Sequence, residues 1–280
     1  MATIDLERFM KSHKTVSIAG LGAIGLPLAR SLDQGRAPGF QLISVNSRDP
    51  AKAHAAVADF AAKPRVCISA SDLVDADIII EAAPAAAFLG IARPAISAGK
   101  TFIACSAGAL MRNIWLVEEA EREGARIIVP SGALIGLDAV RAAAQGHITS
   151  CTIETRKSPS GWLGAPYLAE NAITLEGLTE AECIFEGNAL DAAAGFPANV
   201  NVAAALAMAG IGPLNTKVRL IADPAADRNI HHVVVDSDAA RFTMTVEGKP
   251  SPENSRTGLL TPLSVIACLR SLHETLRVGS

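Results

Sequence analysis

Three glycines near the start of the chain have the spacing of a nucleotide-binding turn. Gly20, Gly22 and Gly25 form a G-x-G-x-x-G pattern between a short β-branched run and an apolar stretch with helical spacing. In such a turn the first glycine permits the bend, the second lets backbone approach a pyrophosphate, and the third lets helix pack on strand. The helix start, with Ala23 and Ile24, then offers free N–H groups to the phosphates. The pattern predicts a dinucleotide site, and a purely structural glycine turn is the alternative.

The residues after the second predicted strand indicate which dinucleotide is bound. About 20 residues past the glycines, an NAD site often has an acidic residue that binds the ribose 2′-hydroxyl. Here that position holds Asn46, followed by Ser47 and Arg48. A hydroxyl and a guanidinium can hold a 2′-phosphate, so these residues favour NADP, or the use of both NAD and NADP. In the alternative interpretation Arg48 is a solvated loop residue, and Asp49 caps the next helix with proline at its first position.

A histidine pair in the second half is the main candidate for proton transfer. Hydride transfer needs a proton carrier, and histidine suits that role because its pKa lies near neutrality. His231 and His232 open a predicted strand that follows a turn at Ala222-Asp223-Pro224. Neighbours on a strand point to opposite faces, so at most one of the two faces a site. In the alternative interpretation the pair is one packed and one exposed structural histidine.

Two asparagines and three small-residue segments are further candidate ligand contacts. Asn199 and Asn201 interrupt an apolar helix start. In the alternative interpretation Asn199 is only the N-cap of that helix, whereas a buried amide at Asn201 needs partners that a bound ligand could supply. Small residues also follow three predicted strands, at the sheet edge where backbone can approach a ligand. We expect cofactor contacts there at Ala83, Ala107 and Ala133.

The elements that must position these residues alternate regularly in the first half of the chain. After the glycine turn, apolar strand patterns recur at 41–46, 65–68, 77–81, 100–105 and 126–129. Helical patterns lie between them, among them 86–98 and about 111–123. Alternation of this kind implies right-handed crossovers and a doubly wound parallel sheet. The sequence therefore predicts an N-terminal α/β Rossmann domain for dinucleotide binding over residues 1–138.

The pattern changes after about Asp138. Half-exposed strand patterns recur at 147–156, 216–221, 230–235 and 241–246, whereas 157–180 is rich in loop-forming residues. Several antiparallel-looking strands predict a C-terminal α+β domain, residues 139–280, with an open mixed or antiparallel sheet. A last helix, 259–276, has Thr261 as its expected N-cap and Pro262 next. We expect this helix to pack back on the first domain.

The composition argues against several classes of protein. Half of the residues are apolar, 19% are charged and 4% are aromatic, so the core must be mainly Ala, Val, Ile and Leu. A net charge of −3 without a basic block predicts no nucleic-acid partner. No long uninterrupted apolar stretch or signal-peptide pattern predicts a membrane span or export. Five scattered cysteines without CxxC spacing favour reduced thiols in a cytoplasmic protein, with neither a disulfide framework nor a metal site.

Taken in order along the chain, these segments resemble the L-aspartate dehydrogenase family. The matching segments are the glycine turn, 106–110, 131–133, 155–157, 185–187, 196–203, 222–224, 229–232 and 248–257. The resemblance covers nearly the whole chain and implies a Rossmann domain plus an α+β domain that supplies catalysis and, as a rule, homodimer contacts. It implies oxidation of L-aspartate with NAD or NADP, through iminoaspartate, to oxaloacetate and ammonia. The imine can feed NAD biosynthesis.

The same resemblance assigns roles to particular residues. By position, His231 matches the family's catalytic acid/base, and Ala133 and Asn201 match cofactor-contacting positions. The two substrate carboxylates need cations or helix N-termini. Candidate cations are Arg156, Lys157, Lys217 and Arg256. A related amino-acid dehydrogenase or imine reductase of the same fold, and a non-catalytic NAD(P)-sensing protein, are the alternative functions.

Overall fold

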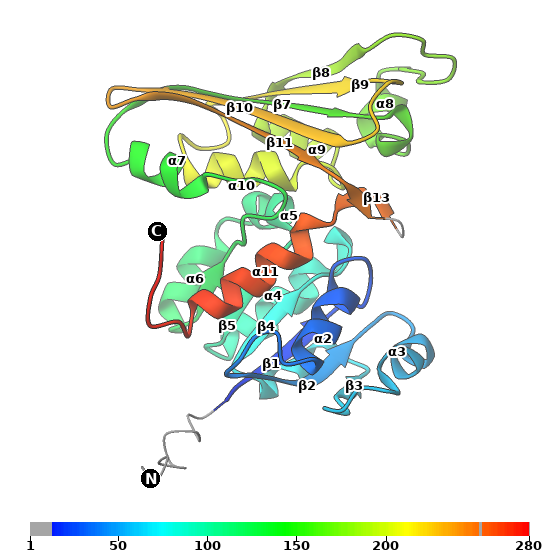
Figure 1. The fold of residues 1–280 in the computed structure, drawn as a ribbon, viewed down its shortest axis with the longest axis vertical. Coiled ribbons are helices and arrows are strands. Elements are labelled where there is room, and N and C mark those ends of the chain that lie inside the picture. The colour runs from blue at the N-terminus through cyan, green and yellow to red at the C-terminus, as the bar shows by residue number, and fades with distance from the viewer. Residues whose placement is uncertain (1–12, 252–253, 280) are drawn as a thin grey trace, which may run out of the picture.

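The computed structural model describes residues 13–251 and 254–279, and for 250, 251 and 254–257 it describes the backbone only. Two sheets lie one above the other, with helices between them and around the lower sheet (Figure 1). The lower sheet is built from the first half of the chain and the upper sheet from the second half. Several candidate site residues, among them Ile24, Asn201 and His231, lie where the two layers face each other.

The lower sheet has six strands, all parallel, in the order β3-β2-β1-β4-β5-β6. They are β1 (Lys14–Ala19), β2 (Phe40–Asn46), β3 (Arg65–Cys67), β4 (Ile78–Glu81), β5 (Thr101–Ala104) and β6 (Arg126–Ile128). The predicted doubly wound parallel sheet is confirmed. Strand order reverses between β1 and β4, the point where dinucleotides bind in such sheets.

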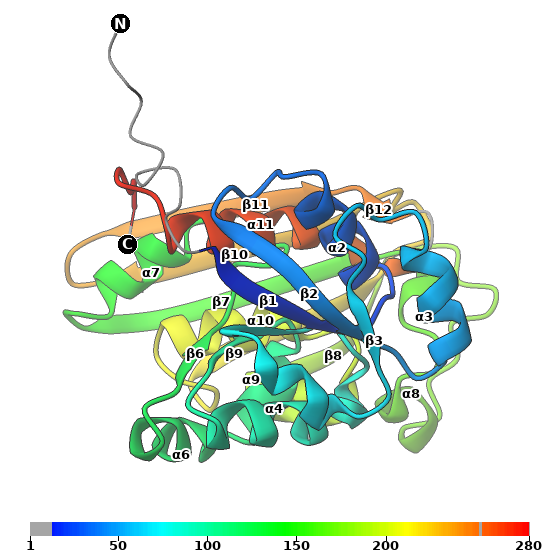
Figure 2. The same cartoon turned by 90° about the horizontal axis from the view of Figure 1, so that it is seen from below.

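Helices cover both faces of this sheet. They are α2 (Gly25–Asp33), α3 (Pro50–Val57), α4 (Phe88–Ser97), α5 (Ala107–Arg112), α6 (Leu116–Arg122) and α11 (Leu260–Ser271), with short 3₁₀ turns η1 (Ala70–Asp75) and η2 (Ala85–Ala87). Seen from below, α2 and α11 lie on one side of β1 and β2, and α4 and α6 lie on the other (Figure 2). Val265 and Leu269 of α11 are fully buried in one core cluster with Leu28 of α2. The end of the chain thus completes the first layer.

Two predicted helices have different limits in the structure. The stretch expected to be helical from about 111 to 123 is divided into α5 and α6, because the chain turns at Asn113, whose side chain bonds back to Ala109 O. The last helix begins after Leu259 rather than Thr261, and it ends at Ser271. Pro262 is tolerated there because the first turn of a helix has no use for its missing N–H.

The upper sheet has the order β11-β10-β7-β9-β8, in which only β7 and β9 are parallel. Its strands are β7 (Ile148–Lys157), β8 (Glu182–Asn188), β9 (Thr216–Ala222), β10 (Asn229–Ser237) and β11 (Arg241–Gly248). Helices α7 (Leu137–Ala143), α8 (Pro166–Glu170), α9 (Ala189–Gly195) and α10 (Asn201–Ala209) lie on its lower side, toward the first layer (Figure 1). A small ladder, β12 (Pro250–Ser251) with β13 (Asn254–Gly258), leads to α11. The predicted α+β arrangement with an open mixed sheet is confirmed.

The segment 157–180, which the sequence predicts as loop, contains a buried anchor. It forms a 3₁₀ turn, η3 (Pro159–Gly161), and the helix α8, both with proline in the first turn. Trp162 is fully buried, its Nε1 donates to Ile221 O at 3.1 Å, and its ring meets Phe196 edge-on. Pro159 and Pro166, which suggest a loop in the sequence, therefore occupy the first turns of short helices.

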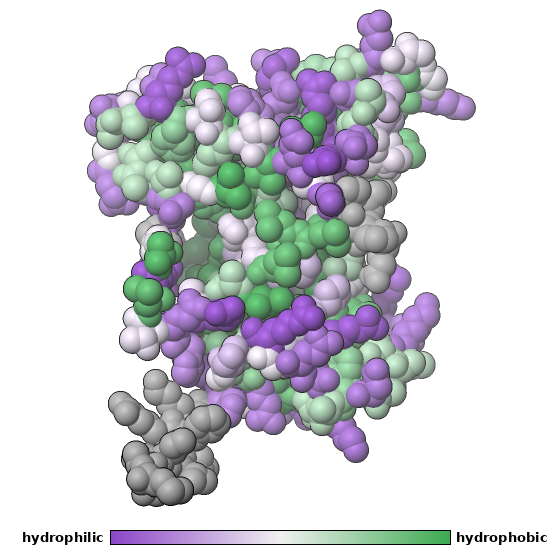
Figure 3. All heavy atoms as spheres, viewed as in Figure 1, coloured by the Kyte–Doolittle hydropathy of each residue, from purple (hydrophilic) through white to green (hydrophobic). Residues whose placement is uncertain are grey.

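The first layer and the second share no sheet. Helix α7 begins at Leu137, close to the domain boundary predicted at residue 138, and that boundary remains a prediction. Among the described residues, no helix has the length and apolar character needed to cross a membrane. Apolar side chains gather across the middle of the face in Figure 3, over α11, where Leu259 and Leu263 are exposed.

Candidate active site

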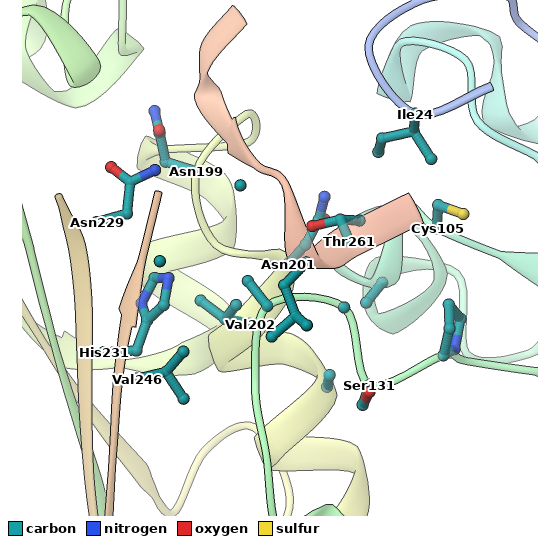
Figure 4. A pocket seen from close by; sticks show the side chains of 18 of the residues that line it. Ile24, Cys105, Ser131, Asn199, Asn201, Val202, Asn229, His231, Val246 and Thr261 are labelled. Carbon is teal, nitrogen blue, oxygen red and sulfur yellow. The ribbon is translucent and has the colours of Figure 1, made fainter. Parts of the chain in front are cut away.

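A cleft opens between the two layers, and both contribute to its walls. About 840 Å³ of the cleft is free of atoms, counting the solvent at its open mouth. In Figure 4, His231, Asn229 and Val246 of the upper sheet lie on one side and Ile24 and Cys105 of the lower layer on the other. Asn201 and Thr261 lie between them. The cleft therefore brings the predicted proton carrier opposite the glycine turn.

The glycine turn has the geometry that a dinucleotide requires. Gly20 has φ +95°, and a Cβ on it would lie 2.6 Å from Ala82 O. A Cβ on Gly25 would overlap Gly20 O, so the third glycine lets α2 pack against the turn. A Cβ on Gly22 would meet nothing within 4 Å, so its backbone is open to a ligand. The turn thus fits a pyrophosphate placed against Gly22 at the start of α2.

The structure places the other predicted cofactor residues in two groups. Ile24, Ala107, Ala133 and Asn201 line the cleft. Ala83 is the second residue after β4 and packs beside the turn, since a Cβ on Gly20 would lie 2.9 Å from the Cα of Ala83. The cleft is therefore lined by residues that lie far apart in the sequence.

Ser47 and Arg48 form the second group, because they follow β2 at the same sheet edge but do not line the cleft. Arg48 is exposed, and Asp49 caps α3 by accepting from Lys52 N at 3.1 Å. Asn46 donates through Nδ2 to Cys67 O and Ile68 O at 2.8 and 3.1 Å. The capping part of the alternative interpretation is therefore confirmed, and an exposed Arg48 is also free to meet a ribose phosphate.

His231 is the titratable residue at the centre of the upper wall. It lies on β10, is 4% exposed, and its Nδ1 is 3.0 Å from Thr155 Oγ1 on the neighbouring strand. His232 points to the opposite, exposed face, where its ring bonds Thr245 at 2.8 Å. The prediction that at most one of the pair faces a site is confirmed. Burial, and then the charge of Lys157, lower the pKa of His231 to about 3, so its ring is neutral near pH 7.

A buried lysine supplies positive charge to the same cleft. Lys157, the last residue of β7, is 3% exposed, and its Nζ donates to Asn199 Oδ1 at 3.1 Å. The ammonium also lies 5.1 Å from the centre of the Trp162 ring. The alternative interpretation of Asn199 as an N-cap is wrong, because Val200 occupies that position and Asn199 accepts from the lysine.

The other candidate cations lie elsewhere. Arg156 pairs with Glu154 at 3.3 Å and Asp223 at 2.9 Å on the outer face of the sheet. Lys217 is exposed on β9 and does not line the cleft. The side chain of Arg256, on β13, lies outside the described residues. Among the described candidates, Lys157 alone lines the cleft.

Two asparagines complete the described walls. Asn201 is the first residue of α10, not one turn into it, and its Oδ1 accepts from Gly108 N at 3.1 Å. The amide oxygen of this half-buried side chain thus bonds to α5 and ties the two layers together. Asn229 is 8% exposed and lines the cleft two residues before His231. The period of two along a strand, which puts both side chains on one face, was a signal that could have identified it.

A buried carboxylate lies under the lower wall. Glu81, at the end of β4, is 0% exposed. It accepts from Ser106 N and Ser106 Oγ, both at 2.9 Å, and from Ala83 N at 3.1 Å. Burial raises the pKa of Glu81 to about 7, against the opposing effect of these hydrogen bonds. Sequence reasoning placed both segments at the sheet edge but gave this pair no role.

The cleft has no grouping of metal-binding side chains in the part of the chain that the structure describes. No three His, Cys, Asp or Glu residues come together there in a way that could hold a metal ion. All five cysteines are free. The chemistry available to the described walls is therefore that of buried nitrogen bases, amides and backbone N–H groups.

Comparisons with known proteins agree with this two-layer arrangement. Residues 138–272 match the family model "Aspartate dehydrogenase, C-terminal", and residues 20–130 match "Homoserine dehydrogenase, NAD binding domain". The chain is 48% identical to an L-aspartate dehydrogenase of Bradyrhizobium diazoefficiens over 96% of this chain and 95% of the relative. It is 46% identical to L-aspartate dehydrogenase 3 of Bordetella bronchiseptica over 95% and 97%. The crystal structure of an aspartate dehydrogenase from Thermotoga maritima superposes with a TM-score of 0.71 at 25% identity, covering 95% of this chain and all of that one.

Proposed function

The chain belongs to the L-aspartate dehydrogenase family, and from this premise we propose which residues carry out the reaction. The enzyme is an oxidoreductase that oxidises L-aspartate with NAD or NADP. The Cα hydrogen leaves as a hydride, water adds to the resulting imine, and oxaloacetate and ammonia are released. The nicotinamide supplies the hydride acceptor, and the protein must hold the substrate and move protons.

His231 is the proposed proton carrier. When its Nδ1–H donates to Thr155 Oγ1, the lone pair of Nε2 is left to accept a proton in the cleft. There it would take the proton from the water that attacks the imine and return it to the departing amine. The pKa of His231 is low in the ligand-free site because burial and Lys157 oppose a positive charge. Two substrate carboxylates bring negative charge, which raises that pKa toward the range a proton carrier needs.

Lys157 is the proposed partner of a substrate carboxylate. A buried ammonium held by Asn199 can form a charge-assisted hydrogen bond at low entropic cost, because its position is already fixed. Asn229 and Asn201 line the same cleft and offer amide groups to the substrate. The observation that carries the proposal is that His231 and Lys157, both buried, line one cleft opposite the glycine turn.

The proposed cofactor contacts follow the first layer. Backbone at Gly20, Gly22, Ala23, Ile24 and Gly25 would hold the pyrophosphate. The nicotinamide half would contact Ala83, Ala107, Ala133 and Asn201. The adenosine ribose would contact Ser47 and Arg48. Support comes from the open backbone at the second glycine and from the four of these residues that line the cleft. Arg48 is exposed at the end of the neighbouring strand, where a 2′-phosphate would extend.

The test is NAD(P)H formation measured with L-aspartate under each cofactor, with glutamate, alanine and homoserine as competing substrates. We expect aspartate to have the highest kcat/KM. A different preferred amino acid would favour a related dehydrogenase, preferential reduction of other imines would favour an imine reductase, and cofactor binding without turnover would favour a sensor. Arg48→Ala should weaken NADP activity about tenfold and leave NAD activity unchanged. Equal loss with both cofactors would contradict its proposed contact with the phosphate.

We also propose that the enzyme is a cytoplasmic homodimer whose imine product can feed NAD biosynthesis. The five free thiols support a reducing compartment. The exposed Leu259 and Leu263, at the start of α11, and the apolar band in Figure 3 support association with a second copy. Light scattering after size-exclusion chromatography should give twice the 29.0 kDa of the chain. A monomer mass at working concentrations would refute the dimer.

A further inference from the structure

The buried carboxylate of Glu81 lies behind the sheet edge that the cofactor would cover. We propose that Glu81 tunes the preference of the site between oxidised and reduced cofactor, by placing a buried negative charge behind the nicotinamide half. This inference rests on the proposed function, since it assumes that NAD or NADP binds at the glycine turn. It assigns Glu81 no contact with the substrate and no proton transfer to it. Glu81 is therefore a specificity-determining residue and not a catalytic one.

The position of Glu81 follows from the sheet order. A dinucleotide straddles the reversal between β1 and β4, so one half lies over β2 and the other over β4 and β5. The candidate ribose-phosphate contact, Arg48, follows β2, which leaves the β4–β5 side for the nicotinamide. Glu81 ends β4, and its register partners are Ala19 on β1 and Ala104 on β5. The carboxylate thus lies under the half of the site where hydride transfer takes place.

The hydrogen bonds of Glu81 connect it to the backbone that borders this half. Its carboxylate accepts from Ala83 N and from Ser106 N. Ala83 is itself an expected cofactor contact, and Ser106 directly precedes another, Ala107. Ala82, between Glu81 and Ala83, is the residue that the first glycine packs against. Movement or loss of the Glu81 charge would therefore change the affinity of the site for the cofactor.

No described residue neutralises this charge through an ion pair. The titratable group that faces it is the thiol of Cys105, on the segment after β5, whose pKa is raised well above its usual value by burial and then by Glu81 itself. Cys268, on α11, comes next and its pKa is also raised by burial. Both thiols are neutral near pH 7. The guanidinium groups of Arg126 and Arg277 act on Cys268, so Glu81 is the source of negative charge among the described groups on this side.

The hydroxyl of Ser106 lets the site hold either protonation state of Glu81. When Glu81 is ionised, Ser106 Oγ donates to it at 2.9 Å. Ala83 O lies 3.4 Å from the same hydroxyl, so Ser106 can turn to donate there and accept from a protonated Glu81. Both states have hydrogen-bond partners, and burial brings the pKa of Glu81 to about 7. The charge therefore changes within the working range of pH.

The two redox forms of the cofactor respond differently to this charge. The oxidised nicotinamide ring carries a positive charge and the reduced ring is neutral. An ionised Glu81 attracts the oxidised ring, whereas a protonated Glu81 does not. As pH falls through about 7, the affinity for the oxidised cofactor should fall, whereas that for the reduced cofactor should stay level or rise. We expect a change on the order of tenfold, the size of one pKa unit.

The experiment measures the dissociation constants of NAD⁺ and NADH for the full-length protein at several pH values between about 5.5 and 8.5, without substrate. NADH is followed by its fluorescence and NAD⁺ by competition with it. Glu81→Gln should raise the Kd of NAD⁺ about tenfold at pH 8, leave that of NADH within about twofold, and flatten the pH dependence. Asp77→Asn is the matched control, because this exposed carboxylate precedes the same strand at the far edge of the sheet.

Ser106→Ala gives a second, independent readout that a structural role alone would not move. Loss of the hydroxyl donor should shift the midpoint of the NAD⁺ pH profile upward by on the order of one unit, with both affinities retained at high pH. The inference is overturned if Glu81→Gln changes both Kd values equally, if Asp77→Asn reproduces its effect, or if the Ser106→Ala midpoint does not move. Failure of the wild-type chain to bind either cofactor would remove the proposed function as well.

Discussion

The two walls of the cleft recognise their ligands by different means. The lower wall is made mostly of small and apolar residues, such as Ile24, Ala107 and Ala133, and the buried acid Glu81 accepts hydrogen bonds from the backbone behind it. The upper wall is made of buried polar side chains, chiefly His231 and Lys157. Burial shifts the pKa of Glu81 upward to about 7 and that of His231 downward to about 3. In both cases the fold favours the neutral form.

The difference teaches how each wall can be altered. Recognition by backbone depends on the absence of side chains, since a Cβ at Gly20 or Gly25 would collide with neighbouring backbone. Side-chain recognition depends on partners supplied by other strands and loops, such as Thr155 for His231 and Asn199 for Lys157. We therefore expect changes in the lower wall to affect cofactor binding, and changes in the upper wall to affect turnover and substrate binding.

The largest expected effect comes from His231 in the upper wall. His231→Ala should lower kcat by roughly 10²- to 10⁴-fold, because the variant lacks the proton carrier, while the Kd of the cofactor stays nearly unchanged. Steady-state kinetics and cofactor titration measure the two quantities. His232→Ala is the matched control, since that ring lies on the outer face against Thr245. Near-normal turnover of the first variant would refute the assignment.

Lys157 should give the next largest effect. Lys157→Met keeps the apolar stem but removes the charge, so KM for L-aspartate should rise roughly 10- to 100-fold, the worth of a charge-assisted hydrogen bond. Lys217→Met, on the exposed side of the adjacent strand, is the control and should leave KM unchanged. An unchanged KM for the Lys157 variant would mean that another group binds the carboxylate.

In the lower wall, two glycines should separate binding from stability. Gly25→Ala forces a Cβ onto Gly20 O, so we expect a loss of about 1–3 kcal/mol of unfolding free energy together with weaker cofactor binding. Gly22→Ala meets no protein atom, so it should weaken cofactor binding and leave the unfolding free energy nearly unchanged. Chemical denaturation and NADH titration measure the pair. Equal destabilisation by both variants would show that Gly22 has a structural role.

The smallest expected effect is an opposite response of the two walls to acid. Relative to its usual 6.5, the lowered pKa of His231 contributes stability above pH 6.5 that is lost as pH falls toward 3. Relative to its usual 4.5, the raised pKa of Glu81 contributes stability below pH 4.5 that is lost as pH rises toward 7. Between pH 6.5 and 4.5 the two effects oppose each other.

Variants of His231 and Glu81 should change the pH dependence of Tm in opposite directions. His231→Gln should reduce the fall of Tm between pH 6.5 and 4.5, and Glu81→Gln should increase it, each by the equivalent of about 1–2 kcal/mol. Thermal melts at several pH values provide the measurement, with the parent chain as reference. A change of the same sign in both variants would contradict the stated directions of the two pKa shifts.

Much of the lower wall could be predicted from local sequence. The glycine spacing, the strand–helix alternation and the cap at Asp49 are local features, and each is found where the sequence placed it. The errors came where tertiary contacts decide. In the alternative interpretation Asn199 caps a helix, but it instead accepts from Lys157, and the proline-rich segment expected as loop buries Trp162.

Local sequence patterns predicted the two-part architecture and the glycine turn, because periodicity and spacing act between near neighbours in the chain. The family resemblance came from the motifs and their order. The sequence by itself also determined that at most one residue of the histidine pair faces the cleft, because strand geometry alternates. Only the tertiary structure decided that Lys157, among the described candidates, lines the cleft with His231, and that Glu81 is buried without a described cation. Burial and charge environment arise from residues far apart in sequence, so they exist only once both layers have folded.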